Sequence, residues 1–206
     1  VLYNGVDRKI KKFPTKKKEI LFVGRLVAEK GVDLYVDVVE NIAKNFPDWT
    51  FELIGSFRLG DNKNTDVFAN NLIKKFKKIS NQTKFHGFKN QEFIQKKMKT
   101  ASIIVIPSVW AEPFGLVAAE AMSNGIGIIA SNVGGIPEIV KANGVLIKDI
   151  NKQKIEYALT DLMSDPSKRK NLQRKSWDNF NLSAKKSSEK LDFYREMISS
   201  RYFVDD

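Results

Sequence analysis

Two glutamates, Glu112 and Glu120, lie eight positions apart in the segment Glu-Pro-Phe-Gly-Leu-Val-Ala-Ala-Glu, and their spacing limits the chemistry they can share. If one helix carries both, they are roughly 12 Å apart along its axis. The paired carboxylates of a retaining glycosidase stand only about 5 Å apart. The spacing therefore disfavours hydrolysis by a carboxylate pair. It favours two carboxylates that accept hydroxyl hydrogen bonds from different parts of one long ligand.

The residues after Glu112 predict a site for phosphate at a helix start. Pro113 suits the first position of a helix, so we expect the backbone amides of Phe114, Gly115 and Leu116 to be free and to point outward. Free amides and the helix dipole together favour the binding of phosphate oxygens.

Each of the two glutamates also has a purely structural interpretation. Glu112 can be a charge before a helix start, and Glu120 a solvated helical residue. The neighbours of Glu120 argue against the second interpretation. They are three alanines and a methionine, among which a carboxylate without a partner is costly to bury. We therefore keep both residues as candidate ligand contacts.

Two cations after the first predicted strand form a second candidate for phosphate binding. Arg25 and Lys30 lie between Gly24 and Gly31, where the chain turns into a helix. Gly24 permits close approach of a ligand to the backbone, and the two cations can converge on a diphosphate near the helix start. An ordinary turn with two surface cations explains this segment equally well when it is taken alone. The glycine spacings of a dinucleotide fingerprint or a P-loop are absent.

The elements that would position these residues alternate along the chain. Short runs rich in β-branched residues predict strands at 19–23, 50–55, 83–86, 102–107, 127–131 and 144–147. Amphipathic patterns predict helices at 31–44, 67–79, 91–99, 115–124 and 136–140, and further helices follow the last strand. In that last region Asn151 is the expected N-cap, Pro166 starts another helix, and 183–202 forms the final one.

This alternation predicts an α/β fold. We expect a Rossmann-like parallel sheet of about six strands with helices on both faces and a helical C-terminal extension. Ligands of such sheets bind outside the carboxyl ends of the strands, which is where the candidate residues lie.

Charge and composition narrow the classes of partner. The formal net charge of +11 predicts attraction to phosphates in a nucleotide, a nucleic acid or an anionic membrane. Seven basic residues lie between Arg8 and Lys18, but stacking aromatics are not interleaved with them, so we expect no nucleic-acid binding. The run is either a solvated surface or a segment that faces an anionic membrane.

The lack of cysteine and the single histidine exclude other chemistry. No disulfide, thiolate metal site or multi-histidine metal site can form, and a Ser-His hydrolase would have to use His86. We interpret His86 as a structural residue at a strand end. A chain without cysteine fits a reducing compartment, so we expect a cytoplasmic location, with peripheral association at the inner face of a membrane left open.

Four motifs, taken in order, carry a resemblance to a known family. They are Gly24-Arg25-Leu26 with Glu29-Lys30-Gly31, Glu112-Pro-Phe-Gly-Leu, Glu120-Ala-Met and Gly134-Gly-Ile-Pro-Glu138. Together they resemble the C-terminal, donor-binding domain of the GT-B, family 4 (group 1) glycosyltransferases, along nearly the whole chain. The resemblance implies that the fold is one half of a GT-B fold. It also implies a retaining transfer of a sugar from a UDP-, GDP- or ADP-sugar, without a metal or other cofactor.

The resemblance also implies roles for single residues. Arg25, Lys30 and Glu112 would be the catalytic set: the two cations hold the diphosphate and Glu112 contacts the donor sugar. Glu120 would bind the ribose hydroxyls. The remaining donor-binding positions are Gly24, Gly87 and Phe88, the last two beside the base, and the amides of Phe114, Gly115 and Leu116. Gly134 and Gly135 either allow a tight turn or contact the ligand.

The resemblance divides the chain into three parts. Residues 1–18 are an inter-domain linker and basic segment, 19–165 the nucleotide-sugar-binding domain, and 166–206 helices that pack toward an N-terminal acceptor domain absent from this sequence. That domain would bind most of the acceptor, which is a sugar, lipid or polysaccharide. The turn Gly55-Ser56-Phe57-Arg58 departs from the family pattern and leaves the base pocket undefined.

Two other functions stay open. One is a nucleotide-sugar epimerase of the same fold. The other is a non-catalytic module that binds nucleotides or polyanions through its lysines.

Overall fold

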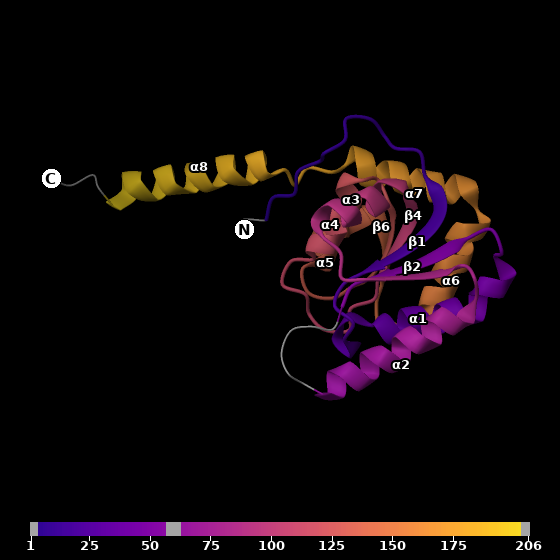
Figure 1. The fold of residues 1–206 in the computed structure, drawn as a ribbon. Helices are drawn as coiled ribbons and strands as arrows, with labels where there is room; N and C mark the ends of the chain where they lie inside the picture. The colour runs from indigo at the N-terminus through magenta and orange to yellow at the C-terminus, as the bar shows by residue number, and fades with distance from the viewer. Residues whose placement is uncertain (1–3, 57–62, 203–206) are drawn as a thin grey trace.

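The core of the protein is one six-stranded parallel sheet with the order β3-β2-β1-β4-β5-β6 (Figure 1). The structure is a computed structural model that describes residues 4–56 and 63–202, without the side chains of 63–66, 201 and 202. The strands are β1 (Lys17–Val23), β2 (Thr50–Ile54), β3 (Thr83–Gly87), β4 (Ala101–Ile106), β5 (Gly127–Ser131) and β6 (Gly144–Ile147). The predicted Rossmann-like sheet is confirmed, and each predicted strand lies within about two residues of its observed bounds.

The apolar runs of the sequence become strands because both faces of the sheet are covered. Every residue of β4 and β5 is buried. A strand that is buried on both sides reads as a continuous apolar run and not as an alternation, which is the pattern of parallel sheets under helices.

Helices cover both faces of the sheet, as predicted. The helices of the main body are α1 (Val32–Ile42), α2 (Lys63–Ile79), α3 (Gln91–Thr100), α4 (Leu116–Ser123), α5 (Ile136–Val140), α6 (Lys152–Ser164) and α7 (Pro166–Asp178). One hydrophobic cluster joins the sheet to α1, α2 and α6, and a second joins it to α3, α4 and α5. Successive residues of β1, Ile20 and Leu21, belong to opposite clusters because side chains alternate across a strand.

The two helices that follow β6, α6 and α7, begin at the residues expected from their capping preferences. The Asn151 side chain accepts a 3.0 Å hydrogen bond from the Lys154 amide at the start of α6. Asp165 caps α7, and Pro166 occupies its first turn. Helix α1 is shorter than predicted, since its last turn becomes the 3-10 helix η2 (Ala43–Asn45), and α2 begins earlier, at Lys63.

The final helix, α8 (Ala184–Tyr202), extends away from the body of the domain (Figure 1). Phe193, Met197 and Ile198 are exposed along it. Before α8 the chain passes the N-terminal segment, where the Val6 amide donates a 2.7 Å hydrogen bond to the Leu182 carbonyl. Among the described residues, no helix is long and apolar enough to cross a membrane.

Candidate donor-binding site

The strand order reverses between β1 and β4, and the candidate residues gather at the carboxyl ends of these two strands. Ligands of open α/β sheets bind in the crevice at such a switch point. The residues that follow β1 and β2 lie so close together that only glycine fits at position 55. A Cβ atom on Gly55 would lie 1.8 Å from the Gly24 carbonyl oxygen, and the Gly55 amide donates a 2.9 Å hydrogen bond to Gly87.

A cavity of about 140 Å³ opens at this edge. Its lining includes five of the predicted site residues: Gly24, Lys30, Glu112, Gly115 and Leu116. The structure therefore brings the two motifs, which are far apart in the sequence, to one place.

Lys30, Glu112 and Ser108 form a polar cluster in this cavity. The Lys30 ammonium is paired with the Glu112 carboxylate, and the Ser108 hydroxyl donates a 2.7 Å hydrogen bond to Oε1 of Glu112. The Lys30 and Glu112 side chains are only 19% and 13% exposed, so water and salt screen this pair less than a surface pair. The cavity thus holds a cation together with its counter-ion at the carboxyl ends of β1 and β4.

The position of Lys30 depends on the turn that follows it. Lys30 ends the 3-10 helix η1 (Ala28–Lys30), and Gly31 follows with a φ of +64°. A Cβ atom on Gly31 would lie 2.0 Å from the Pro107 carbonyl oxygen, just past β4. Only glycine allows this close packing, which brings the β1 and β4 loops together.

Helix α4 lies within one residue of the predicted 115–124, but the expectation that Pro113 occupies its first position is wrong. The helix begins at Leu116, with Gly115 as its N-cap at a φ of +91°, so Pro113 and Phe114 belong to a loop. A left-handed residue cannot continue a helix, and this conformation at Gly115 outweighs the local preference of Pro113. The helix-start residues that line the cavity are Leu116 and Val117, whose amides have no partner within the helix.

The glycine pair after β5 packs against the loop that carries Glu112. A Cβ atom on Gly134 would lie 2.3 Å from the Glu112 carbonyl oxygen, and one on Gly135 would lie 2.7 Å from that of Pro113. The Gly135 amide also donates a 2.7 Å hydrogen bond to the Glu112 carbonyl. These glycines therefore serve a close approach between two loops.

Glu120 lies apart from this cavity and faces α3. It is buried in α4, and its Oε1 accepts a 2.5 Å hydrogen bond from the side-chain amide of Gln91, the first residue of α3. Burial raises the pKa of Glu120, while the hydrogen bond from Gln91 and the charge of Lys9 lower it. Since Glu112 lies outside the helix, the predicted separation along one helix axis does not describe these two carboxylates.

The predicted residues Arg25, Gly87 and Phe88 are not among those that line the cavity. The Arg25 guanidinium lies 3.9 Å from the Glu29 carboxylate. Gly87 ends β3 at a φ of +68°, and Phe88 after it is 78% exposed. Phe57 and Arg58, where the sequence departs from the family pattern, lie outside the described residues.

His86 is held by a buried carboxylate behind the β3–α3 turn. Its Nε2 lies 2.8 Å from Oε2 of Glu52, which also accepts a 2.7 Å bond from the Lys97 ammonium. Glu52 is fully buried, so it needs such partners. The His86 ring thus fixes the strand end that leads to Gly87.

Sequence reasoning missed two residues of the site, Ser108 and Gln91. Ser108 lies two residues after the end of β4, which is a position where side chains reach the ligand edge. Gln91 has no comparable signal, because its partner Glu120 is distant in the sequence.

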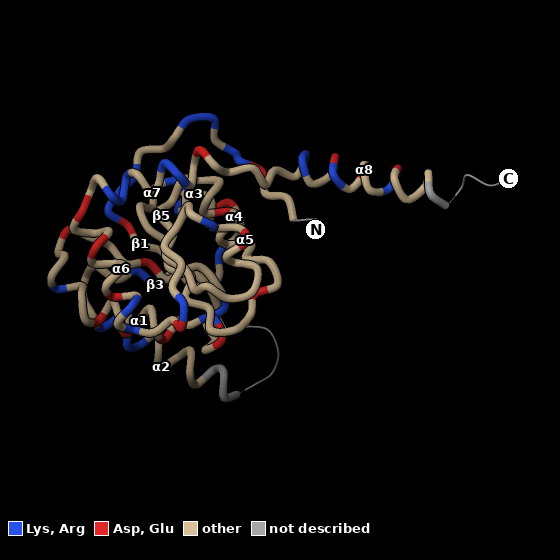
Figure 2. The backbone as a smooth tube through the Cα atoms, turned by 180° about the vertical axis from the view of Figure 1, so that it is seen from behind, with Lys and Arg blue, Asp and Glu red and all other residues tan. Residues whose placement is uncertain are grey.

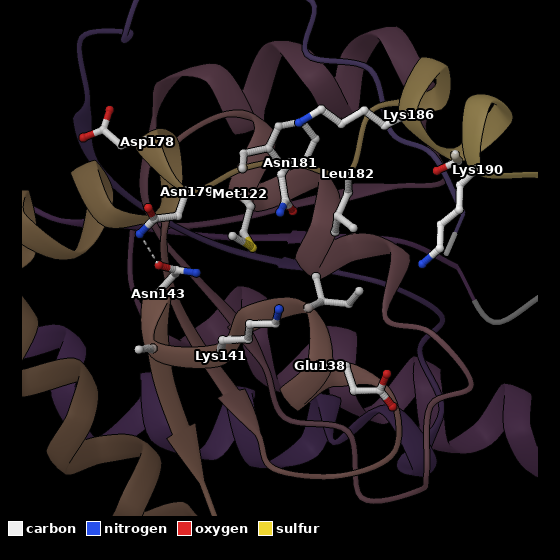
Figure 3. A pocket seen from close by; sticks show the side chains of 14 residues that line it. Met122, Glu138, Lys141, Asn143, Asp178, Asn179, Asn181, Leu182, Lys186 and Lys190 are labelled. Atoms are coloured by element: carbon white, nitrogen blue, oxygen red, sulfur yellow. Dashed lines mark hydrogen bonds between the residues drawn. The ribbon is translucent and has the colours of Figure 1, made fainter. Parts of the chain in front are cut away.

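A wider groove of about 800 Å³ lies on another side of the domain (Figure 3). Residues of α5, the α7–α8 connection and the start of α8 surround it, with Glu138 facing Lys190 across the opening in Figure 3. Its lining shares no residue with the cavity at Lys30.

Comparison with known proteins assigns the chain to a family. The family model of the glycosyl transferases group 1 matches residues 5–177. The chain belongs to this family. The predicted resemblance is confirmed, and the match includes all the motifs on which it rested.

Curated relatives of this group 1 chain are longer than the chain. An uncharacterized glycosyltransferase of Methanocaldococcus jannaschii is 32% identical over 174 residues, which cover 79% of this chain and 42% of that protein. Spore coat protein SA of Bacillus subtilis is 35% identical over 164 residues, covering 76% and 42% of the two proteins. The chain thus spans about 42% of the length of these relatives.

Solved structures share the fold of this group 1 domain. The C-terminal domain of LpcC, a group 1 family protein of Francisella tularensis, is 29% identical with a TM-score of 0.68, covering 86% of this chain and 93% of that one. Anabaena HepE in complex with UDP has a TM-score of 0.75 at 21% identity, covering 90% and 49%. The first of these is a single domain, and the second is about twice as long as the matched region.

Proposed function

We propose that this chain is the donor-binding domain of a retaining glycosyltransferase that moves a sugar from a nucleoside diphosphate sugar to an acceptor. The observation that carries the proposal is the cavity at the β1/β4 switch point. It combines the paired Lys30 and Glu112 with the amides of the α4 start, which have no partner within the helix. The structure of Anabaena HepE with UDP-glucose supports the nucleotide-sugar assignment, since that protein has a similar fold.

The cavity supplies the charges that departure of a diphosphate requires. When the bond from the sugar to the diphosphate breaks, negative charge develops on the phosphate oxygens. The Lys30 ammonium and the amides of Leu116 and Val117 stabilise that charge, with Arg25 added when its weak contact with Glu29 breaks. Fixed positive groups of this kind make a metal unnecessary for the leaving group.

The diphosphate exchanges partners with Glu112. In the free protein Glu112 holds Lys30, and Ser108 holds Glu112 in place. Once phosphate oxygens take over the ammonium, the carboxylate is released to accept hydroxyl hydrogen bonds from the donor sugar. We assign this role to Glu112 and no nucleophilic step to it.

Glu120 is assigned to the ribose. It lies at the α3 side of α4, and the β3–α3 turn at Gly87 and Phe88 is assigned to the base. Burial leaves the Glu120 carboxylate short of hydrogen-bond partners beyond Gln91, so that ribose hydroxyls complete its hydrogen bonds.

The acceptor would be bound mainly by a partner domain. The exposed apolar side chains of α8 support an expectation that this helix packs against such a domain. Closure between the two domains would exclude water and align the acceptor, so this chain alone should bind donor but transfer sugar poorly. The lack of cysteine supports a cytoplasmic location.

A thermal-shift screen tests the proposal. UDP, GDP, ADP and one sugar conjugate of each are added to the chain and to its Glu120→Ala variant. A ligand at a hundred times its Kd stabilises the folded state by about 2.7 kcal/mol, which raises the melting temperature measurably. We expect one nucleotide to stabilise the wild type and to lose most of this effect in the variant.

The screen also separates the alternatives. Indifference of the wild type to every nucleotide would refute donor binding. Equal stabilisation of wild type and variant would place the nucleotide elsewhere on the chain. Release of nucleoside diphosphate by a longer form of the protein, without transfer to any acceptor, would favour an epimerase.

A further inference from the structure

A second basic groove lies at the opposite edge of the sheet from the donor site. Its volume is about 500 Å³. Six of its twelve lining residues are Lys or Arg, and none is Asp or Glu: Phe13, Pro14, Thr15, Lys16, Lys17, Lys18, Ser102, Pro166, Arg169, Lys170, Gln173 and Arg174. These residues come from the segment before β1, the starts of β1 and β4, and α7, and Lys and Arg gather near α7 in Figure 2.

Three of the six cations already have structural partners. Lys16 donates to the carbonyls of Met98, Lys99 and Asn124, and burial lowers its pKa to about 7. Lys18 is paired with Asp48. Arg169 donates to two carbonyls at the end of α6. These three residues form the walls of the groove and are not counted as ligand contacts.

The other three cations are Lys17, Lys170 and Arg174. All three are exposed, and no carboxylate is paired with any of them among the described residues. The Arg174 guanidinium lies 4.0 Å from the ring centre of Phe13, which holds it over the groove and leaves its edge free to donate. Like charges held together without counter-ions favour the binding of an anion.

The groove is too far from the donor site to bind the same ligand. Lys17 begins β1, and Gly24 follows its last residue. A seven-residue strand spans about 20 Å at roughly 3.3 Å per residue. The two basic sites therefore lie at opposite ends of β1.

We propose that Lys17, Lys170 and Arg174 form a second anion site that binds the phosphate groups of a ligand other than the sugar donor. The chemistry it recognises is a phosphate monoester, diester or pyrophosphate, brought either by a soluble molecule or by the headgroup of an anionic lipid. A guanidinium and two ammonium groups match the charge and hydrogen-bonding capacity of phosphate oxygens. This site is independent of the proposed donor chemistry.

Two matched triple variants test the site. The groove variant carries Lys17→Gln, Lys170→Gln and Arg174→Gln. The control carries Lys74→Gln, Lys78→Gln and Lys84→Gln, which are exposed lysines of α2 and β3. Both variants lose three positive charges, so a difference between them reports position and not net charge. Circular dichroism confirms that each is folded, and exposed positions make this the expected result.

Binding of inorganic pyrophosphate is measured by calorimetry in chains that also carry Arg25→Ala and Lys30→Ala. These two changes remove the phosphate contacts of the donor site. We expect the groove variant to bind pyrophosphate at least about tenfold more weakly than the host chain, since charge-assisted hydrogen bonds are lost. The control should stay within about twofold of the host, because its charges lie elsewhere.

Sedimentation with vesicles identifies the source of the phosphate. The chains are mixed with vesicles of phosphatidylglycerol or of phosphatidylcholine. A lipid ligand predicts binding to phosphatidylglycerol that falls by about a hundredfold in the groove variant, at roughly 1 kcal/mol per cation. If only the groove variant loses pyrophosphate binding, and none of the chains binds the vesicles, the natural ligand is a soluble molecule. Equal losses in groove variant and control, or no binding in either arm, would overturn the proposal.

Discussion

Glu112 and Glu120 belong to one motif, yet the structure treats them differently. Glu112 sits in a loop with a cation and a hydroxyl as partners, whereas Glu120 is buried in a helix beside a neutral amide. The first carboxylate is compensated before any ligand arrives. The second has no ion pair among the described residues, and burial raises its pKa by more than the hydrogen bond from Gln91 and the charge of Lys9 lower it. The two carboxylates of one motif therefore differ in what ligand binding would require. In our proposal Glu112 must first give up its ion pair with Lys30, whereas Glu120 has no ion pair to break before it accepts hydrogen bonds from hydroxyl groups.

The largest expected effect comes from removing the compensating cation. Lys30→Ala deletes the cation that we assign to the diphosphate and leaves the Glu112 carboxylate without its ion pair. We expect the Kd for the nucleoside diphosphate to rise by about thirtyfold or more, since a hydrogen bond to a charged group contributes about 1.5–3 kcal/mol. Calorimetry measures this, and Lys30→Arg, which keeps the charge, should retain most of the affinity. An unchanged Kd would remove Lys30 from the phosphate site.

Glu120→Gln should change nucleotide affinity and the stability of the free protein in opposite directions. Nucleotide affinity should fall by about tenfold, because a neutral amide accepts hydroxyl hydrogen bonds less strongly than a carboxylate. The free protein should become more stable at pH 7. Because the pKa of Glu120 is raised, the folded chain keeps the carboxyl proton to a higher pH than the unfolded chain does. The contribution of Glu120 to the free energy of unfolding is therefore full at low pH and is lost as pH rises through the folded pKa.

The pH dependence supplies the check on this variant. Melting temperatures of wild type and Glu120→Gln are compared at pH 4 and pH 7, with the exposed Glu92→Gln as control. The gain in stability should be present at pH 7, shrink at pH 4 and be absent in the control. A loss of stability at pH 7 would contradict the cost assigned to the buried carboxylate.

Gln91→Leu tests whether the neutral amide positions Glu120. Without that donor the pKa of Glu120 should rise further, because the hydrogen bond from Gln91 lowers it. We expect affinity for the nucleoside diphosphate to fall by about threefold to tenfold, or about 0.7–1.4 kcal/mol, because Gln91 acts on the nucleotide only through the position of Glu120. Affinity for its 2′-deoxy analogue should fall less. An equal loss for both nucleotides would indicate a general structural effect.

The smallest effect is expected at Ser108. Ser108→Ala removes one hydrogen bond to Glu112 and leaves its ion pair with Lys30 intact. Nucleotide affinity should weaken by about threefold to fivefold, in line with roughly 1 kcal/mol for such a bond. Ser108→Thr keeps the hydroxyl and serves as the control. A loss as large as that of Lys30→Ala would mean that the hydroxyl itself contacts the ligand.

The fold was predictable because its signals are local. Runs such as Ile103 to Ile106 identify buried strands, and Asn151 and Pro166 mark helix starts through their own side chains. The neighbourhood of Lys30 and Glu112 was also predictable, since both follow strands of a parallel sheet and carboxyl ends meet at one edge.

The details of the site depend on tertiary contacts that no local pattern encodes. Pro113 predicted a helix start, but the helix begins at Leu116 because Gly115 adopts a left-handed conformation. The bond between Gln91 and Glu120 joins two helices whose relative rotation the sequence does not reveal. Pairing of Lys30 with Glu112 likewise required knowing how the two loops pack.

The close packing of Gly134 and Gly135 against the Glu112 loop has a mechanical consequence. The two loops leave no space for a Cβ atom at Gly134 or Gly135, and the Gly135 amide donates a hydrogen bond to the Glu112 carbonyl. Neither loop can therefore move without the other, so the loop that carries Glu112, which we assign to the donor, should move together with the loop after β5. Opening for product release would then have to come from hinge motion of the whole domain, and not from a lid at this edge.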